Sequence, residues 1–186
     1  MASLYLHIPF CKSRCIYCDF YSGTDTSQRA RYVQALCDEL KLRSTYLPTR
    51  VLDSIYFGGG TPSLLQKTDF ERLFEAIHTH FTLSPAAEIT LECNPDDLTP
   101  SYVAQLQELP FNRISIGIQS FDDAELRFLN RRHTARQAQD AVALCQAHGF
   151  DNISIDLMYG LPNQTVETWR KTLAVAMSLR SEEHTS

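Results

Sequence analysis

The sequence predicts an α/β fold in which parallel strands alternate with helices, as in a TIM-type (β/α) barrel. Five short apolar runs are each followed by a turn and then by apolar residues at helical spacing. Strands that alternate with helices form parallel βαβ units with right-handed crossovers. Unusual polar residues and glycines fall at the ends of these runs, where such barrels carry their sites. A doubly wound open sheet uses the same repeat and remains the alternative.

The composition is that of a globular domain. The chain has 186 residues, 44% of them hydrophobic, and a formal net charge of −5, so it can bury one substantial core. No basic stripe is present, and we expect no nucleic-acid partner. Without a membrane-spanning run or a signal-peptide layout, we expect a cytoplasmic protein. A transient association with a membrane surface stays open.

The first half of the chain contains three predicted strands and three predicted helices. The strands are expected over residues 4–10, 51–57 and 88–93. A helix is expected over residues 27–46, and a second runs from near Thr68 or Asp69 to Phe81. Thr99 and Pro100 are a typical N-cap and first residue for the third.

The second half continues the alternation. Strands are expected over residues 113–118 and 152–159. Asp122 begins a short helical piece, and Thr134 with Gln137 forms a capping-box pattern before a helix that Gly149 ends. A last helix starts near Val166. About five βα units are therefore expected.

The most informative stretch is a loop that follows the first predicted strand. Cys11, Cys15 and Cys18 stand there in a C-x3-C-x2-C spacing. A structural zinc site normally takes four ligands and a disulfide takes two, whereas a [4Fe-4S] cluster held by three cysteines keeps one iron open to another ligand. The alternatives are a zinc site completed by a distant His or Cys, and unrelated buried cysteines.

Other unusual residues follow the later strands. A triple glycine, residues 58–60, closes the second strand and lets backbone approach a ligand closely; a tight turn is the alternative explanation. Glu92, Gln119 and Asp156 lie at or near the ends of the next three strands. We expect all of them to converge on one face with the cysteine loop.

These motifs resemble those of a known family. The cysteine spacing, with Tyr17 before the last cysteine, resembles the radical S-adenosylmethionine (SAM) signature. The strings HIPFCKSRCIYCDFYS, FGGGTPSLL, LECNPDDLT, RISIGIQSFDDAELRFLNRRH and ISIDLMYGLPNQT resemble the oxygen-independent coproporphyrinogen III dehydrogenases and the related HemW-type heme chaperones. The resemblance implies a radical SAM core whose open iron is chelated by SAM, which an electron from the cluster cleaves to a 5'-deoxyadenosyl radical.

The resemblance also implies a set of SAM contacts. They are Tyr5, Tyr17, Gly59, Gly60, Thr61, Glu92, Gln119, Arg131 and Asp156. Arg131 can pair with the SAM carboxylate, and Glu92 or Asp156 can accept from hydroxyls or the ammonium group. The plainer interpretations are an exposed basic helix end for Arg131, a loop cap for Asp156 and simple packing for Tyr17.

Two functions are compatible with the resemblance. One is a chaperone that binds heme and carries it to acceptor proteins, with the cluster and SAM in structural or regulatory roles; the other is the dehydrogenase, which decarboxylates coproporphyrinogen III and needs an electron donor. The dehydrogenases carry a further cysteine two places after the last cluster ligand, where this chain has Phe20. The chaperone is therefore favoured. His7 and His133 are not assigned as heme ligands; His7 alternates with Leu6 and Ile8, and both a position that faces the site and the more usual core position stay open.

The end of the sequence departs from this pattern. Residues 180–186, RSEEHTS, resemble the translation of a sequencing adapter, and we expect a non-native tail after a core that spans residues 1–179. An ordinary polar helix end is the alternative. A complete barrel takes ~250 residues, so we expect the C-terminal part to be missing and the fifth strand to present an unpaired edge.

Overall fold

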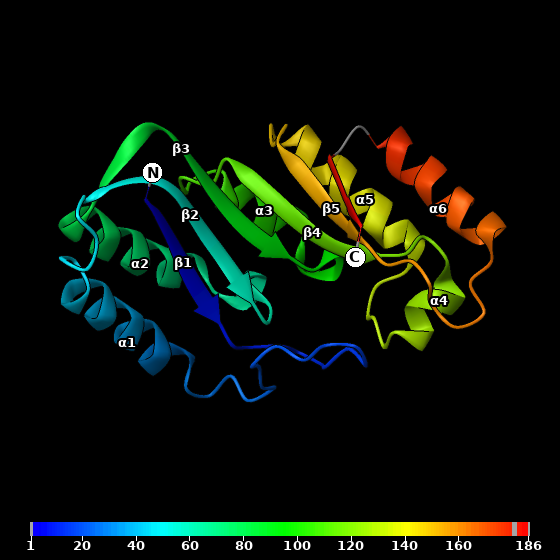
Figure 1. Cartoon of the computed structure of the whole chain (residues 1–186), viewed down its shortest axis with the longest axis horizontal. Coiled ribbons are helices and arrows are strands. Elements are labelled where there is room, and N and C mark those ends of the chain that lie inside the picture. The colour runs from blue at the N-terminus through cyan, green and yellow to red at the C-terminus, as the bar shows by residue number, and fades with distance from the viewer. Residues whose placement is uncertain (1, 180–181, 186) are drawn as a thin grey trace.

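Six parallel strands form one twisted sheet in the order in which they occur along the chain (Figure 1). The computed structural model describes residues 2–179 and 182–185. Its strands are β1 Ser3–Ile8, β2 Val51–Gly59, β3 Thr82–Cys93, β4 Arg113–Gln119, β5 Ile153–Leu157 and β6 Glu182–Thr185. Doubly wound sheets reverse their strand order at a switch point. A strictly sequential order is that of a barrel wall, so the predicted TIM-type architecture is confirmed and the open-sheet alternative is wrong.

Helices connect the strands. They are α1 Arg29–Leu42, α2 Lys67–His80, α3 Pro100–Leu106, α4 Asp123–Phe128, α5 Ala135–Ala147 and α6 Val166–Ser178, with short 3-10 helices η1 Pro62–Leu64 and η2 Pro95–Asp97. Because each crossover moves one strand along the sheet in the same direction, right-handed connections place the covering helices on one face. Among the described helices, none is long and apolar enough to cross a membrane.

The predicted helix starts are confirmed where side chains cap them. The Thr99 side chain accepts a hydrogen bond from the backbone N–H of Tyr102, with Pro100 at the first helical position of α3. Thr134 and Gln137 form the expected capping box at the start of α5. These caps satisfy N–H groups that a helix leaves without a partner in its first turn.

The core lies between the sheet and its helices. Phe57 of β2 is fully buried and contacts the rings of Phe70, Phe74 and Phe111, with centroid distances of 5.6, 5.5 and 5.4 Å. β2 supplies Phe57, one face of α2 supplies Phe70 and Phe74, and the segment before β4 supplies Phe111. A buried parallel strand covered by an amphipathic helix is expected to pack in this way. The core therefore holds the carboxyl ends of the strands in fixed positions.

Two elements differ from expectation. β3 begins six residues before the predicted strand, because Thr82 and Leu83 pair with β2 before the register shifts around Pro85, a residue that obscures a strand in the sequence. The edge of β5 is not open, because β6 pairs with it in parallel from Ser154 to Leu157. The expected unpaired edge is therefore wrong, while residues 180, 181 and 186 of the expected tail lie outside the described residues.

Candidate functional site

The cysteine loop crosses beyond the carboxyl ends of β1 and β2 (Figure 1). Backbone hydrogen bonds close its base, from the Cys11 N–H to the Gly23 carbonyl at 2.9 Å and from the Gly23 N–H to the Pro9 carbonyl at 2.8 Å. Its middle is tied to the segment after α4, because the Asn130 side chain donates to the Arg14 carbonyl at 2.7 Å. The loop is therefore held at its base and at its middle.

A pocket of about 160 Å³ opens between this loop and the strand ends. Eleven of the twelve predicted site residues line it: Cys11, Cys15, Tyr17, Cys18, Gly59, Gly60, Thr61, Glu92, Gln119, Arg131 and Asp156. Tyr5 does not line it; its ring stacks on Tyr56 at 6.1 Å, one side chain away from Glu92. The sequence prediction that these separate stretches converge on one face is thus confirmed.

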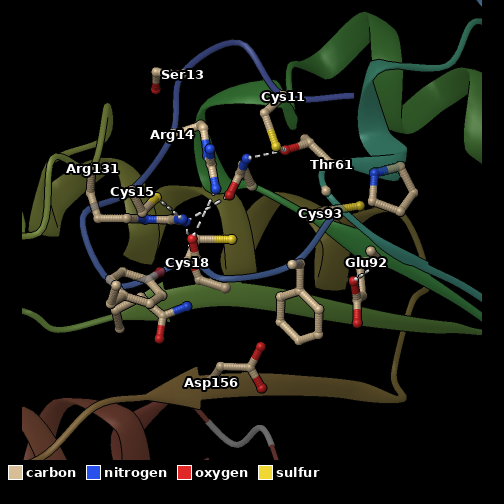
Figure 2. A pocket seen from close by; sticks show the side chains of 18 of the residues that line it. Cys11, Ser13, Arg14, Cys15, Cys18, Thr61, Glu92, Cys93, Arg131 and Asp156 are labelled. Atoms are coloured by element: carbon tan, nitrogen blue, oxygen red, sulfur yellow. Dashed lines mark hydrogen bonds between the residues drawn. The ribbon is translucent and has the colours of Figure 1, made fainter. Parts of the chain in front are cut away.

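The three loop cysteines surround the pocket as free thiols. The Thr61 hydroxyl lies 3.6 Å from the Cys11 sulfur, and an Arg131 nitrogen donates to the Cys15 sulfur at 3.4 Å. Two of the three sulfurs are thus each contacted by a polar side chain of the pocket wall. Figure 2 shows the sulfurs of Cys11, Cys15 and Cys18 facing the same space from three directions.

This arrangement fits a cluster better than a single ion. In the described part of the chain, no three His, Cys, Asp or Glu side chains are grouped so that they could hold one metal ion. A zinc site needs its ligands close around one point. A [4Fe-4S] cluster takes each cysteine on a different iron, and three cysteines that line one pocket are compatible with that arrangement.

The triple glycine brings the β2 end against the cysteine loop. A Cβ on Gly60 would lie 2.7 Å from the Phe10 carbonyl oxygen and 3.0 Å from the Cys11 sulfur. Gly59 has a φ of +116° and would place a Cβ 2.7 Å from the His7 ring. Close approach at Gly60 and an unusual backbone angle at Gly59 therefore require glycine here. The tight-turn explanation applies, and a close approach of this backbone to a ligand stays a prediction.

Glu92 presents a held carboxylate to the pocket. It accepts hydrogen bonds from the Tyr56 hydroxyl at 2.7 Å and from the Gly59 N–H at 3.0 Å. Burial raises the pKa of Glu92, while these two donors act in the opposite direction. The donors fix the position of both oxygens, and each oxygen keeps lone-pair capacity for a further donor.

Arg131 points into the pocket, so the interpretation as an exposed helix end is wrong. Its guanidinium donates to the Asn94 side-chain oxygen at 2.7 Å and to the Gly117 carbonyl, in addition to the Cys15 sulfur (Figure 2). Asn94 in turn donates to the Thr61 hydroxyl at 3.1 Å. A single cation thus joins the cysteine loop to the ends of β3 and β4.

Gln119 and Asp156 come from neighbouring strands. Gln119 ends β4 with a φ of +74°, in a stretch where the pairing with β5 shifts register. A buried non-glycine residue in this conformation is strained, which is typical of functional sites. Asp156 pairs with Gly117 in the same ladder and faces the pocket from below in Figure 2. This location on the pocket wall supports a site role over a simple loop cap.

Tyr17, His133 and His7 have different surroundings in the structure. Burial raises the pKa of Tyr17, which belongs to the cysteine loop and lines the pocket. His133 is buried and hydrogen-bonded to the Ile118 carbonyl at 3.1 Å, and burial, with Arg131 nearby, lowers its pKa to about 4. His7 contacts the Tyr5 hydroxyl and the Tyr21 carbonyl through its two ring nitrogens.

Sequence reasoning missed several lining residues. They are Ser13, Arg14, Phe20, Pro62, Cys93, Asn94, Ser115 and Gly117. Asn94 had a usable signal, because it follows Glu92 by two positions at a strand end where site residues collect. Ser115 and Gly117 had none, since small residues inside an apolar strand are ordinary packing positions.

The sequence matches the radical SAM superfamily over residues 5–176, and the chain belongs to that superfamily. Among curated proteins it is 39% identical to the heme chaperone HemW of Lactococcus lactis subsp. lactis (strain IL1403), over 96% of this chain and 46% of the relative. It is 37% identical to the heme chaperone HemW of Escherichia coli (strain K12), over 95% of this chain and 47% of the relative. The chain thus spans about half the length of these relatives.

Two solved structures are also similar to this chain. The coproporphyrinogen III oxidase HemN from Escherichia coli, described as a radical SAM enzyme, superposes with a TM-score of 0.88 and 30% identity, over 99% of this chain and 44% of that chain. The AdoMet-bound structure of anSMEcpe gives a TM-score of 0.70 at 18% identity, over 100% of this chain and 51% of that chain, which concerns the fold alone.

Proposed function

We propose that Cys11, Cys15 and Cys18 hold a [4Fe-4S] cluster and that the adjoining pocket binds SAM. The support is the donor set: three free thiols face one space, with a guanidinium and a hydroxyl directed at two of the sulfurs. When bound, such a cluster supplies an electron and an open iron for SAM. The protein's own part is to hold three thiolates apart and to exclude a fourth protein ligand.

The pocket walls match the polar groups of SAM. Arg131 is the cation for the carboxylate, and a charge-assisted pair of this kind is among the stronger hydrogen bonds. Glu92 and Asp156 are acceptors for the ammonium group and the ribose hydroxyls. Gly59 and Gly60 leave a backbone strip open, with Thr61, Gln119 and Tyr17 around it. Tyr5 acts indirectly: its ring stacks on Tyr56, and the Tyr56 hydroxyl donates to the pocket residue Glu92.

For the whole protein, we propose a heme chaperone that binds heme and passes it to acceptor proteins. One observation carries this proposal: curated relatives named heme chaperone HemW are 37 to 39% identical over nearly the whole chain. The sequence agrees locally, because Asp19 and Phe20 follow the last cluster cysteine where the dehydrogenases have a further cysteine two places on. A reducing cytoplasm suits cysteines that must stay free to bind iron.

A radical SAM coproporphyrinogen III dehydrogenase is the second candidate. The TM-score of 0.88 to HemN, at 30% identity over 99% of this chain, supports it. Fold similarity alone leaves the substrate undecided, because substrate is chosen by groups at the site. The enzyme would also need an electron donor as a partner.

The test compares the two activities on the full-length protein. The reconstituted protein is titrated with heme and followed by absorbance, and a parallel sample is incubated with coproporphyrinogen III, SAM and reductant. We expect retained heme that transfers to an acceptor apoprotein, with no decarboxylated product. Decarboxylated product from protein that retains no heme would contradict the chaperone and establish the enzyme.

A further inference from the structure

A second set of charges lies beside the cofactor pocket but does not line it. Lys12 directly follows the first loop cysteine, and its ammonium contacts a carboxylate oxygen of Asp97 at 2.5 Å. Asp97 is buried, with its side chain 3% exposed, whereas the Lys12 side chain is half exposed. Neither residue is part of the pocket wall. The pair therefore joins the loop to the 3-10 helix η2 at a place outside the pocket.

Asp97 is bonded to two further segments. Its second oxygen accepts from the Ser63 hydroxyl at 2.9 Å, in the 3-10 helix that follows the triple glycine. Arg132 lies 3.5 Å from the oxygen that Lys12 contacts, and it pairs with Asp96 at 2.7 Å. Arg132 precedes α5 and directly follows the pocket residue Arg131. The buried Asp97 carboxylate therefore contacts Lys12, Ser63 and Arg132, each of which is adjacent in sequence to a residue that lines the pocket.

The charges in this group balance. Two cations, Lys12 and Arg132, face two carboxylates, Asp96 and Asp97. A buried carboxylate is costly unless it is paired and hydrogen-bonded, and Asp97 has a hydroxyl and two cations around it. Removing one of these charged side chains leaves the remaining charges incompletely paired. We therefore expect the segments that carry them to shift. The cluster loop is one of those segments.

We propose that Asp97 is a positioning residue for the iron-sulfur site: through Lys12 and Arg132 it sets where Cys11 and Arg131 stand. This inference rests on the proposed cluster. It assigns Asp97 no contact with the cluster or SAM. Outer partners that orient metal ligands typically change metal affinity by about 10- to 100-fold when removed, so the effect belongs in cluster retention.

The test measures how fast an iron chelator removes the cluster from the reconstituted full-length protein. Asp97→Asn keeps the shape and the Ser63 hydrogen bond but loses the charge. Lys12→Met removes the half-exposed partner and leaves the buried residues in place, so it serves even if the first variant folds poorly. We expect each variant to lose its cluster about tenfold faster than wild type.

A matched control separates positioning from general destabilisation. Asp69 is also a buried carboxylate, paired with Arg29 at 3.0 Å and bonded to the Gln66 N–H, but it lies far from the pocket wall at the start of α2. Asp69→Asn is expected to lower the thermal midpoint of the apoprotein and leave the rate of cluster loss unchanged.

The double variant Lys12→Met with Asp97→Asn completes the cycle. If Lys12 acts through Asp97, the double variant loses its cluster no faster than Asp97→Asn alone. Additive rates, or acceleration by Asp69→Asn equal to that of Asp97→Asn, would overturn the inference. Wild-type retention in Lys12→Met would overturn it while the proposed function stands, whereas wild-type protein that binds no cluster removes both.

Discussion

Five of the six cysteines lie in two regions with different surroundings, three in the loop and two in the core, while Cys37 lies half-buried on α1. Cys93 and Cys145 are buried among apolar side chains, and burial raises the pKa of both, that of Cys145 to about 12. The cysteines of the loop stand around a polar pocket, where an Arg131 nitrogen lies 3.4 Å from the Cys15 sulfur. Burial thus acts on the two core thiols, whereas polar side chains contact two of the loop sulfurs.

The difference bears on which cysteines would hold the proposed cluster. Iron binds thiolate, and a thiol whose pKa is raised by burial is a poor ligand. Burial raises the pKa of Cys93. Cys11 is also buried and also lines the pocket, but it lies on the same loop as Cys15 and Cys18 and contacts the Thr61 hydroxyl, so its place in the loop and its polar contact, rather than its exposure, separate it from Cys93.

The strongest test of this comparison removes one loop cysteine and one core cysteine in separate variants. Cys15→Ala should abolish the cluster, because a cubane held by only two protein thiolates is not retained. Cys145→Ala should leave iron and sulfide content at the wild-type level. Iron and sulfide are measured after anaerobic reconstitution. Equal iron in both variants would show that the loop is not the ligand set.

The next largest effect concerns the cation beside the loop. Arg131→Met should weaken SAM binding by about 10- to 100-fold, since a hydrogen bond to a charged group contributes ~1.5–3 kcal/mol. Affinity is measured by calorimetry on the reconstituted protein. Arg136→Met is the matched control, because Arg136 is 82% exposed and pairs only along its own helix with Asp140. Similar affinities in the two variants would remove the role proposed for Arg131.

A smaller effect is expected where backbone meets the loop. Gly60→Ala places a methyl group 2.7 Å from the Phe10 carbonyl, so the loop must move, and overpacking of this kind costs about 1–3 kcal/mol. Urea unfolding of the apoprotein measures that cost. Gly23→Ala, also at this loop, has open space around its Cβ and should be nearly neutral. Equal destabilisation by both would mean that close approach at Gly60 is not required.

The smallest effect follows from the core thiol. The pKa of Cys145 is raised from 9.0 to about 12, so the unfolded state loses its proton first as pH rises. The stability that Cys145 contributes is complete below pH ~9 and is lost progressively toward pH ~12. Between pH 7.5 and 10, wild type should lose about 1 kcal/mol more than Cys145→Ala in urea unfolding. Parallel pH profiles would contradict a buried protonated thiol.

Much of the fold was predictable because its signals are local. Hydrophobic periodicity located each of the first five strands, and the caps at Thr99 and Thr134 marked where helices begin. β3 was underestimated because Pro85 masks its first half. β6 was not predicted, since its residues 182–185 are polar and their pairing with β5 depends on a neighbour distant in sequence.

The site was predictable at its charged and glycine residues and less so around them. Thiols, carboxylates and a triple glycine at strand ends are distinctive, and most of them line one pocket. Asn94 and Asp97 were missed as participants because an amide and an acid after a strand are also ordinary turn residues. The position of Asn94 at a strand end was a usable signal, but its contact with Arg131 and the contact of Asp97 with Lys12 join residues that are distant along the chain.

The most direct measurement is electron paramagnetic resonance of the anaerobically reconstituted and reduced full-length protein, with and without SAM. The account predicts a [4Fe-4S] signal that depends on Cys11, Cys15 and Cys18 and changes shape when SAM is added, because one iron has a coordination position for it. Bound zinc in place of iron, or a cluster signal unaltered by SAM, would contradict the central claim.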